Sequence, residues 1–180
     1  VMGRYAGWIA LYAGIGGGAD VVLIPEIPFD FRKVAARIVE REAFGARFSI
    51  VVVAEGATEV GGTRAIVEHG TPDRAERLGG MGEHVSRELE KLTGKESRFV
   101  VLGHLQRGGP PLAYDRVLAT RFGSHAFELL QRGEFGMMTA LKSPDIVAVP
   151  LADIVGRTRN VPPQGDVVRT ARNMGICVGD

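Results

Sequence analysis

The chain has 180 residues, and its 22 lysines and arginines nearly balance its 21 aspartates and glutamates, for a net charge of +1. This balance gives no support to a nucleic-acid or membrane-surface partner, so any anion must be bound by local charges. No apolar run approaches the roughly 20 residues that a membrane helix needs. Cys177 is the single cysteine, which excludes an internal disulfide and fits a reducing, cytoplasmic location.

Apolar runs alternate with amphipathic segments along the chain. In chain order, the pattern predicts a helix over 7–18, a strand over 19–26, a helix over 29–42, a strand over 48–54, a helix over 73–92, a strand over 98–102, a helix over 113–131, strands over 137–141 and 146–149, and a helix over 151–157. The first three strands are continuously apolar, which is typical of parallel strands buried on both faces. We therefore expect an α/β fold with helices on both faces of a mainly parallel sheet.

Ligands of such sheets bind beyond the carboxyl ends of the strands. Glu55 lies at such a position, because it directly follows the second predicted strand. A carboxylate in this position is costly to bury without a partner. It is therefore either a binding residue or a solvated loop glutamate, and its position alone does not separate the two.

The third predicted strand is followed by His104 and Arg107, just before Gly108 and Gly109. Arginine offers a planar fork of donors, histidine adds another donor, and glycines let the main chain approach a ligand. This combination of residues favours a phosphate-binding site. The alternative is that the histidine is hydrogen-bonded within the protein and the arginine lies on a surface turn. Arg98 begins the same strand, about 20 Å away at roughly 3.3 Å per residue, so we do not expect it to reach the same ligand within one subunit.

Arg4 is a further candidate, because Met2-Gly3-Arg4 precedes the first predicted helix and helix N-termini favour anions.

Two other sequence patterns do not predict a ligand site. The glycine-rich run over residues 14–18 ends a helix and precedes a strand, which is the reverse of the order in a dinucleotide-binding turn. The histidines show no metal-ligand spacing; they are at positions 69, 84, 104 and 125.

The motif R-x4-GHLQRGG-x5-DR over residues 98–116, together with Met2-Gly3-Arg4 and the strand order before Glu55, resembles the 6-phosphofructokinase family. The similarity extends over essentially the whole chain. It implies a phosphofructokinase-like three-layer αβα fold with a mainly parallel sheet. It also implies that the chain is the C-terminal, sugar-phosphate-binding half of a bacterial ATP- or pyrophosphate-dependent enzyme, lacking the N-terminal nucleotide-binding part.

The resemblance implies a role for each candidate on the 98–116 motif. His104 and Arg107 would hold fructose 6-phosphate, with His104 on the 6-phosphate. Arg98 would reach the 6-phosphate bound by a neighbouring subunit, which implies a homo-oligomer, either a dimer or a tetramer.

The resemblance also implies roles near the start of the chain. Glu55 and the main chain around Met2 and Gly3 would bind sugar hydroxyls. Arg4 would contact the substrate and stabilise the transferring phosphoryl group, whose charge spreads over its equatorial oxygens.

By the same resemblance, residues 1–106 form the fructose 6-phosphate-binding lobe, and the helices and short strands of 107–180 pack against the N-terminal lobe. The family's nucleotide or pyrophosphate loop, its general-base aspartate and its Mg²⁺ contacts lie in that N-terminal lobe, and nothing in this chain matches them. We therefore expect the chain alone to be catalytically inactive, with Mg²⁺ held mainly by residues outside it.

The phosphoryl donor and the regulation are less defined. ATP is the expected donor for this glycolytic reaction. Pyrophosphate is the alternative donor, because the runs GWIAL and VVVAEGA resemble the pyrophosphate-using or mixed branch of the family. Where regulated members carry basic residues, this chain has Phe44, Gly45 and Ala46, with Arg47 nearby. Asp20 alone does not make a metal-binding effector site, so we expect weak or absent effector control. A non-catalytic sugar-phosphate-binding module and a plain α/β domain remain the alternatives.

Overall fold

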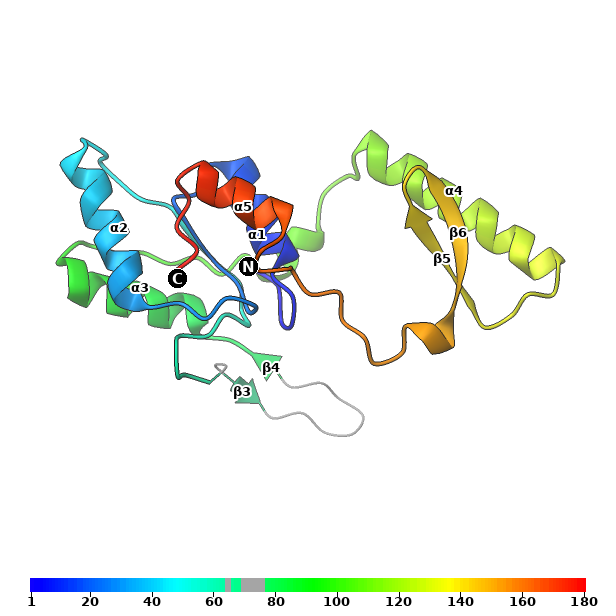
Figure 1. Ribbon diagram of the computed structural model, residues 1–180, viewed down its shortest axis with the longest axis horizontal. Helices are drawn as coiled ribbons and strands as arrows, with labels where there is room; N and C mark the ends of the chain where they lie inside the picture. Colours follow the sequence, from blue (N-terminus) through cyan, green and yellow to red (C-terminus); the bar gives the residue numbers. More distant parts are fainter. Residues whose placement is uncertain (64–65, 69–76) are drawn as a thin grey trace. The chain divides into compact units, whose positions relative to one another are not determined.

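The computed structural model describes residues 1–63, 66–68 and 77–180, and these form two compact units (Figure 1). The first unit comprises Val1–Gln106 and Thr158–Asp180, and the second comprises Arg107–Arg157. The last segment of the chain thus packs with the first unit. Within the described residues, no helix is both long enough and apolar enough to cross a membrane.

The first unit contains most of the regular structure. Its helices and strands are α1 (Trp8–Gly17), β1 (Val21–Leu23), α2 (Phe31–Ala43), β2 (Val51–Val53), β3 (Ile66–Glu68), β4 (Arg77–Leu78), α3 (Met81–Thr93) and α5 (Asp166–Asn173). The short 3₁₀ helix η1 (Gly103–Arg107) ends at the first residue of the second unit. β3 and β4 pair antiparallel.

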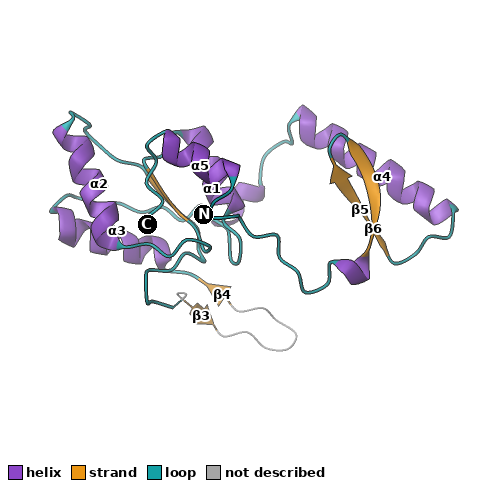
Figure 2. Cartoon of the chain, in the orientation of Figure 1, coloured by secondary structure: helices purple, strands orange, loops and turns teal. Residues whose placement is uncertain are grey.

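The centre of the first unit is the parallel pair β1 and β2, which Cys177 extends through a parallel bridge to Val21. Successive residues of a strand point to opposite faces of a sheet. Val22 accordingly packs in one apolar cluster with residues of α1 and α5, while Leu23 packs in another with residues of α2 and α3. Figure 2 shows these four helices in the first unit. This arrangement confirms the predicted three-layer αβα architecture.

The second unit consists of α4 (Ala113–Gln131), β5 (Met137–Lys142), β6 (Asp145–Pro150) and the 3₁₀ helix η2 (Leu151–Asp153). β5 and β6 form an antiparallel hairpin that packs against α4. Only Leu129 of α4 is buried, so most of the helix surface is uncovered by the described residues.

The predicted strand over 98–102 is wrong, because these residues lie in a loop. The run is apolar, but no described strand pairs with it, and Val100 is 79% exposed. Apolar composition predicts burial, yet a strand also requires a hydrogen-bonded neighbour. None of the described strands supplies a hydrogen-bonded neighbour for residues 98–102.

Other boundaries also differ from the prediction. The helix predicted over 73–92 begins at Met81, after Gly80 adopts a left-handed conformation at its N-cap, and residues 77 and 78 belong to β4. Residues 73–76 lie outside the described part. The helix predicted over 151–157 is the shorter η2, and α5 was not predicted.

Two glycines on α1 provide a matched test of the packing between α1 and β1. A Cβ atom on Gly14 would lie 2.2 Å from Val22 Cγ2, whereas a Cβ atom on Gly16 would meet nothing within 4 Å. We expect Gly14→Ala to lower the free energy of unfolding by about 1–3 kcal/mol through overpacking. Gly16→Ala should instead raise it by up to about 1 kcal/mol through helix propensity. Urea denaturation measures both changes, and equal shifts would contradict the close packing at Gly14.

Candidate functional site

Residues 1–3 lie alongside the carboxyl end of β2. The Val1 amino group donates to the Val53 carbonyl oxygen at 2.7 Å, and the amides of Glu55 and Gly56 donate to the carbonyl oxygens of Val1 and Gly3 at 2.9 and 3.0 Å. These main-chain bonds hold the first residues of the chain at the sheet edge where ligands of α/β folds bind.

The Glu55 side chain is half-buried and points to this segment. Its Oε1 accepts a hydrogen bond from the Gly3 amide at 3.5 Å, while Oε2 accepts none from any described residue. The structure thus places the carboxylate against the main chain of residue 3, where one oxygen remains able to accept further hydrogen bonds.

Gln106 connects the same segment to η1, and the sequence analysis did not select it. Its Oε1 accepts a hydrogen bond from the Met2 amide at 3.3 Å, and its Nε2 donates to the Gly103 carbonyl oxygen at 3.0 Å. The residue lies inside the motif that carries the family resemblance, between His104 and Arg107. Its position in that motif was the signal that could have identified it.

His104 and Arg107 both belong to η1. A 3₁₀ helix has three residues per turn, so side chains three residues apart lie on the same side of it. Both residues are exposed, and within the described chain neither side chain has a hydrogen-bond or ion-pair partner. The turn therefore presents an imidazole and a guanidinium together, with their donors available to an anion.

Arg4 is half-buried at the end of the segment that contacts Glu55. Its Nε is buried and has no hydrogen-bond partner among the described residues. An unsatisfied buried donor is costly, and for a charged group the cost is higher still. The main chain of Arg4 is also tightly confined, because a Cβ atom on Gly56 would lie 2.0 Å from the Arg4 carbonyl oxygen.

Arg98 is not brought together with the other candidates by any described contact. Its side chain is 85% exposed and forms an ion pair with Glu96, with Nη2 2.7 Å from Oε1. The separation of about 20 Å from His104 assumed a strand of roughly 3.3 Å per residue. That estimate no longer applies, because residues 98–102 form a loop.

Glu26 is a second residue that the sequence analysis did not select, although it follows the apolar run of β1 directly. Its two carboxylate oxygens accept from the Gly7 amide, each at 3.1 Å, and Oε1 also accepts from the Val161 amide at 2.7 Å. One carboxylate thereby joins the start of α1 to the segment that leads into α5. It fixes the helix that follows Met2-Gly3-Arg4.

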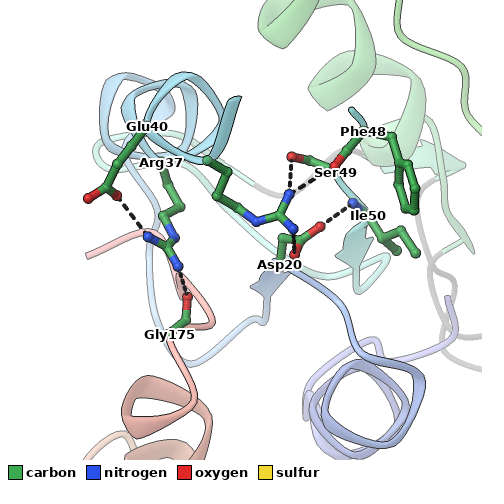
Figure 3. A network of polar contacts seen from close by, with 8 residues as sticks. Asp20, Arg37, Glu40, Phe48, Ser49, Ile50 and Gly175 are labelled. Atoms are coloured by element: carbon green, nitrogen blue, oxygen red, sulfur yellow. Dashed lines mark hydrogen bonds and ion pairs between the residues drawn. The ribbon is translucent and has the colours of Figure 1, made fainter. Parts of the chain in front are cut away.

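Asp20 takes part in a structural network at the opposite edge of the sheet (Figure 3). Its Oδ1 lies 2.7 Å from Arg41 Nη2, and its Oδ2 accepts from the Ile50 amide at 2.7 Å. Arg41 Nη1 also donates to the Phe48 carbonyl oxygen and to Ser49 Oγ, at 2.8 and 2.9 Å. Both Asp20 oxygens are thus engaged in holding α2 to the starts of β1 and β2.

The residues that the structure describes do not fit a resident metal ion. No group of three or more histidine, cysteine, aspartate or glutamate side chains among them is arranged to hold one. The carboxylate of Asp20 is already committed to Arg41.

The comparisons with known proteins agree on one family. The family model described as phosphofructokinase matches residues 1–130. The chain is 53% identical over 180 residues to the ATP-dependent 6-phosphofructokinase of Chloroflexus aurantiacus, covering 100% of this chain and 49% of that protein. It is 51% identical over 166 residues to the pyrophosphate–fructose 6-phosphate 1-phosphotransferase of Amycolatopsis methanolica, covering 91% of this chain and 48% of that protein.

A solved structure shows the same likeness in three dimensions. Phosphofructokinase from Saccharomyces cerevisiae superimposes with a TM-score of 0.73 at 29% identity, over 98% of this chain and 22% of that chain. The chain spans about half the length of the curated relatives it matches.

Proposed function

The chain belongs to the phosphofructokinase family, and on that basis we propose that it forms the sugar-phosphate-binding half of an enzyme that phosphorylates the 1-hydroxyl of fructose 6-phosphate. The single observation that best supports this proposal is the pair His104 and Arg107 on one side of η1, both exposed. Charge-assisted bonds from a guanidinium and an imidazole suit a phosphate. We assign them to the 6-phosphate.

The sugar would be bound by the segment that contacts Glu55. The Glu55 carboxylate lies against the Gly3 amide and has an oxygen available for a sugar hydroxyl. The main chain of Met2 and Gly3 would offer the remaining polar contacts. Gln106 would hold this segment beside the phosphate-binding turn through its bond to the Met2 amide.

Arg4 would act in the transfer step, in which the 1-hydroxyl oxygen bonds to phosphorus while the bond from phosphorus to the donor's leaving oxygen breaks. Negative charge on the transferring group is stabilised by preorganised donors. The buried Arg4 Nε has no partner among the described residues, so none of them competes for this donor. The proton of the hydroxyl would pass to a general base outside this chain.

The donor in this proposal is ATP or pyrophosphate, together with Mg²⁺ held by residues outside the chain. The names of the relatives include both an ATP-dependent and a pyrophosphate-dependent enzyme. The reaction would take place in the cytoplasm.

We further propose that residues 1–106 form the sugar-phosphate lobe and that 107–180 pack against an N-terminal lobe. In a homo-oligomer, Arg98 would leave its exposed pairing with Glu96 for the 6-phosphate bound by a neighbouring subunit. Exposed apolar side chains on α4 support the lobe contact, because this unit leaves them uncovered and a partner lobe could bury them. They include Leu112 at its N-cap, Tyr114, Val117, Phe127 and Leu130.

The proposal is tested by titrating fructose 6-phosphate into a chimera that joins this chain to the part of the Chloroflexus aurantiacus relative that it does not cover. We expect His104→Ala and Arg107→Ala each to weaken binding roughly 10- to 150-fold, because each loses a charge-assisted contact of about 1.5–3 kcal/mol. Isothermal titration calorimetry gives the dissociation constants.

The control is Arg32→Ala, which removes an exposed arginine on α2 and should leave the affinity unchanged. If all three variants bind fructose 6-phosphate like the parent chimera, the assignment of η1 to the phosphate is wrong.

A further inference from the structure

The outer surface of α1 carries two aromatic side chains that the proposed function does not use. Trp8 and Tyr12 are one helical turn apart, with ring centroids 6.0 Å apart and ring planes at 44°. Tyr12 is 60% exposed, and Trp8 is partly buried. Neighbouring rings in this setting offer faces against which a planar molecule can stack.

A cation lies beside the Trp8 ring. The guanidinium carbon of Arg159 is 5.6 Å from the ring centroid, within the range of a cation–π interaction. Trp8 Nε1 donates to the Arg159 carbonyl oxygen at 2.7 Å, and two residues later Val161 is held by Glu26. The backbone that carries this guanidinium is thus fixed, while the guanidinium itself pairs with no carboxylate of the described residues.

These three side chains and Val167 of α5 line an open hollow of about 420 Å³. This volume is in the range of small-molecule sites. Its walls are aromatic and apolar with one positive charge, and none of the described lining residues is acidic. The acid nearby on α5, Asp166, is paired with Arg169 at 2.6 Å.

We propose that this hollow binds a small planar aromatic anion. Its ring would stack on Tyr12 and contact the tilted Trp8 ring beside it, and its anionic group would pair with Arg159. An aromatic surface suits an apolar ring, and the unpaired guanidinium gives a charge-assisted contact that a neutral ring would not use. The site shares no residue with the one proposed for fructose 6-phosphate, so either can fail without the other.

Adenosine 5′-monophosphate is a suitable probe, because it joins a planar ring to a phosphate. Trp8 is the single tryptophan of the chain, so its fluorescence, excited where adenine does not absorb, reports binding directly. We expect saturable quenching by the nucleotide and at least roughly 10-fold weaker binding of adenosine or inorganic phosphate alone, since each supplies only half of the contacts. Absence of saturable quenching would overturn the proposal.

Two matched arginine variants locate the anion. Arg159→Gln should weaken binding of the nucleotide roughly 3- to 10-fold through loss of the charged contact. Arg32→Gln, which removes an exposed arginine on α2 away from the hollow, should leave the affinity unchanged. Equal losses in the two variants, or displacement of the nucleotide by fructose 6-phosphate, would show that the anion binds elsewhere.

Discussion

Arg4→Ala in the Chloroflexus chimera is expected to lower kcat by roughly 100- to 1,000-fold, the loss typical of removing one preorganised donor to developing negative charge. The KM for fructose 6-phosphate should change only a few-fold, because a contact made mainly in the transition state affects kcat more than substrate binding. A coupled assay of fructose 1,6-bisphosphate formation measures both constants, with ATP and with pyrophosphate as donor.

The physical reason for this large effect is the buried Nε of Arg4, which no described residue satisfies. Arg4→Lys keeps the positive charge but loses the planar fork of donors, and it should recover only part of the activity. Arg32→Ala, on the exposed surface of α2, is the control and should leave kcat unchanged. A fall in kcat of less than about 10-fold in Arg4→Ala would remove Arg4 from the transfer step.

Gly56→Ala is expected to destabilise the chain and displace the proposed catalytic segment at once. Its Cβ atom would lie 2.0 Å from the Arg4 carbonyl oxygen and 2.9 Å from that of Gly3. Both contacts are with main chain, which cannot rotate away as a side chain can. We expect the free energy of unfolding to fall by about 1–3 kcal/mol or more, as is found for overpacked sites. Urea denaturation of the isolated chain measures this loss.

The same substitution should also lower the kcat of the chimera, since residues 3 and 4 must move to admit the methyl group. Gly82→Ala is the matched control, because its Cβ atom would meet nothing within 4 Å and the position lies within α3. It should change the stability by no more than about 1 kcal/mol, in the stabilising direction. Similar unfolding midpoints for the two variants would contradict the close contact between Gly56 and Arg4.

The layered core of the first unit was predictable from the sequence. The apolar runs that became β1 and β2 are continuous because both faces of the pair are covered, by α1 and α5 on one side and by α2 and α3 on the other. This is the pattern expected of buried parallel strands. Glycine and proline at the ends of these runs marked the boundaries well enough to place Glu55 at the sheet edge.

The loop over 98–102 shows where such reasoning fails. Phe99, Val100 and Val101 have the composition of a buried strand, yet all three are exposed and unpaired within the described residues. Composition reports the tendency of a segment to be buried, whereas a strand depends on a partner that the segment does not encode. The antiparallel pairing of β5 with β6 was missed for a related reason, since pairing depends on the turn between strands as well as on the strands themselves.

The candidate residues near the start of the chain have contacts that the sequence did not reveal. The Gly3 amide donates to Glu55, and the Gln106 side chain joins the Met2 amide to the Gly103 carbonyl oxygen of η1. Long-range contacts made by main-chain amides leave no periodic signal in a sequence, so Gln106 and Glu26 were not selected. The roles of His104, Arg107, Arg4 and Arg98 remain proposals.

We propose that an imidazole and a guanidinium on one 3₁₀ turn hold a sugar phosphate, with a sugar hydroxyl on the Glu55 carboxylate. A crystal structure of the chimera with fructose 6-phosphate tests it most directly. We expect the 6-phosphate within hydrogen-bonding distance of His104 and Arg107, with a sugar hydroxyl on Glu55. A sugar phosphate bound away from all three residues would contradict it.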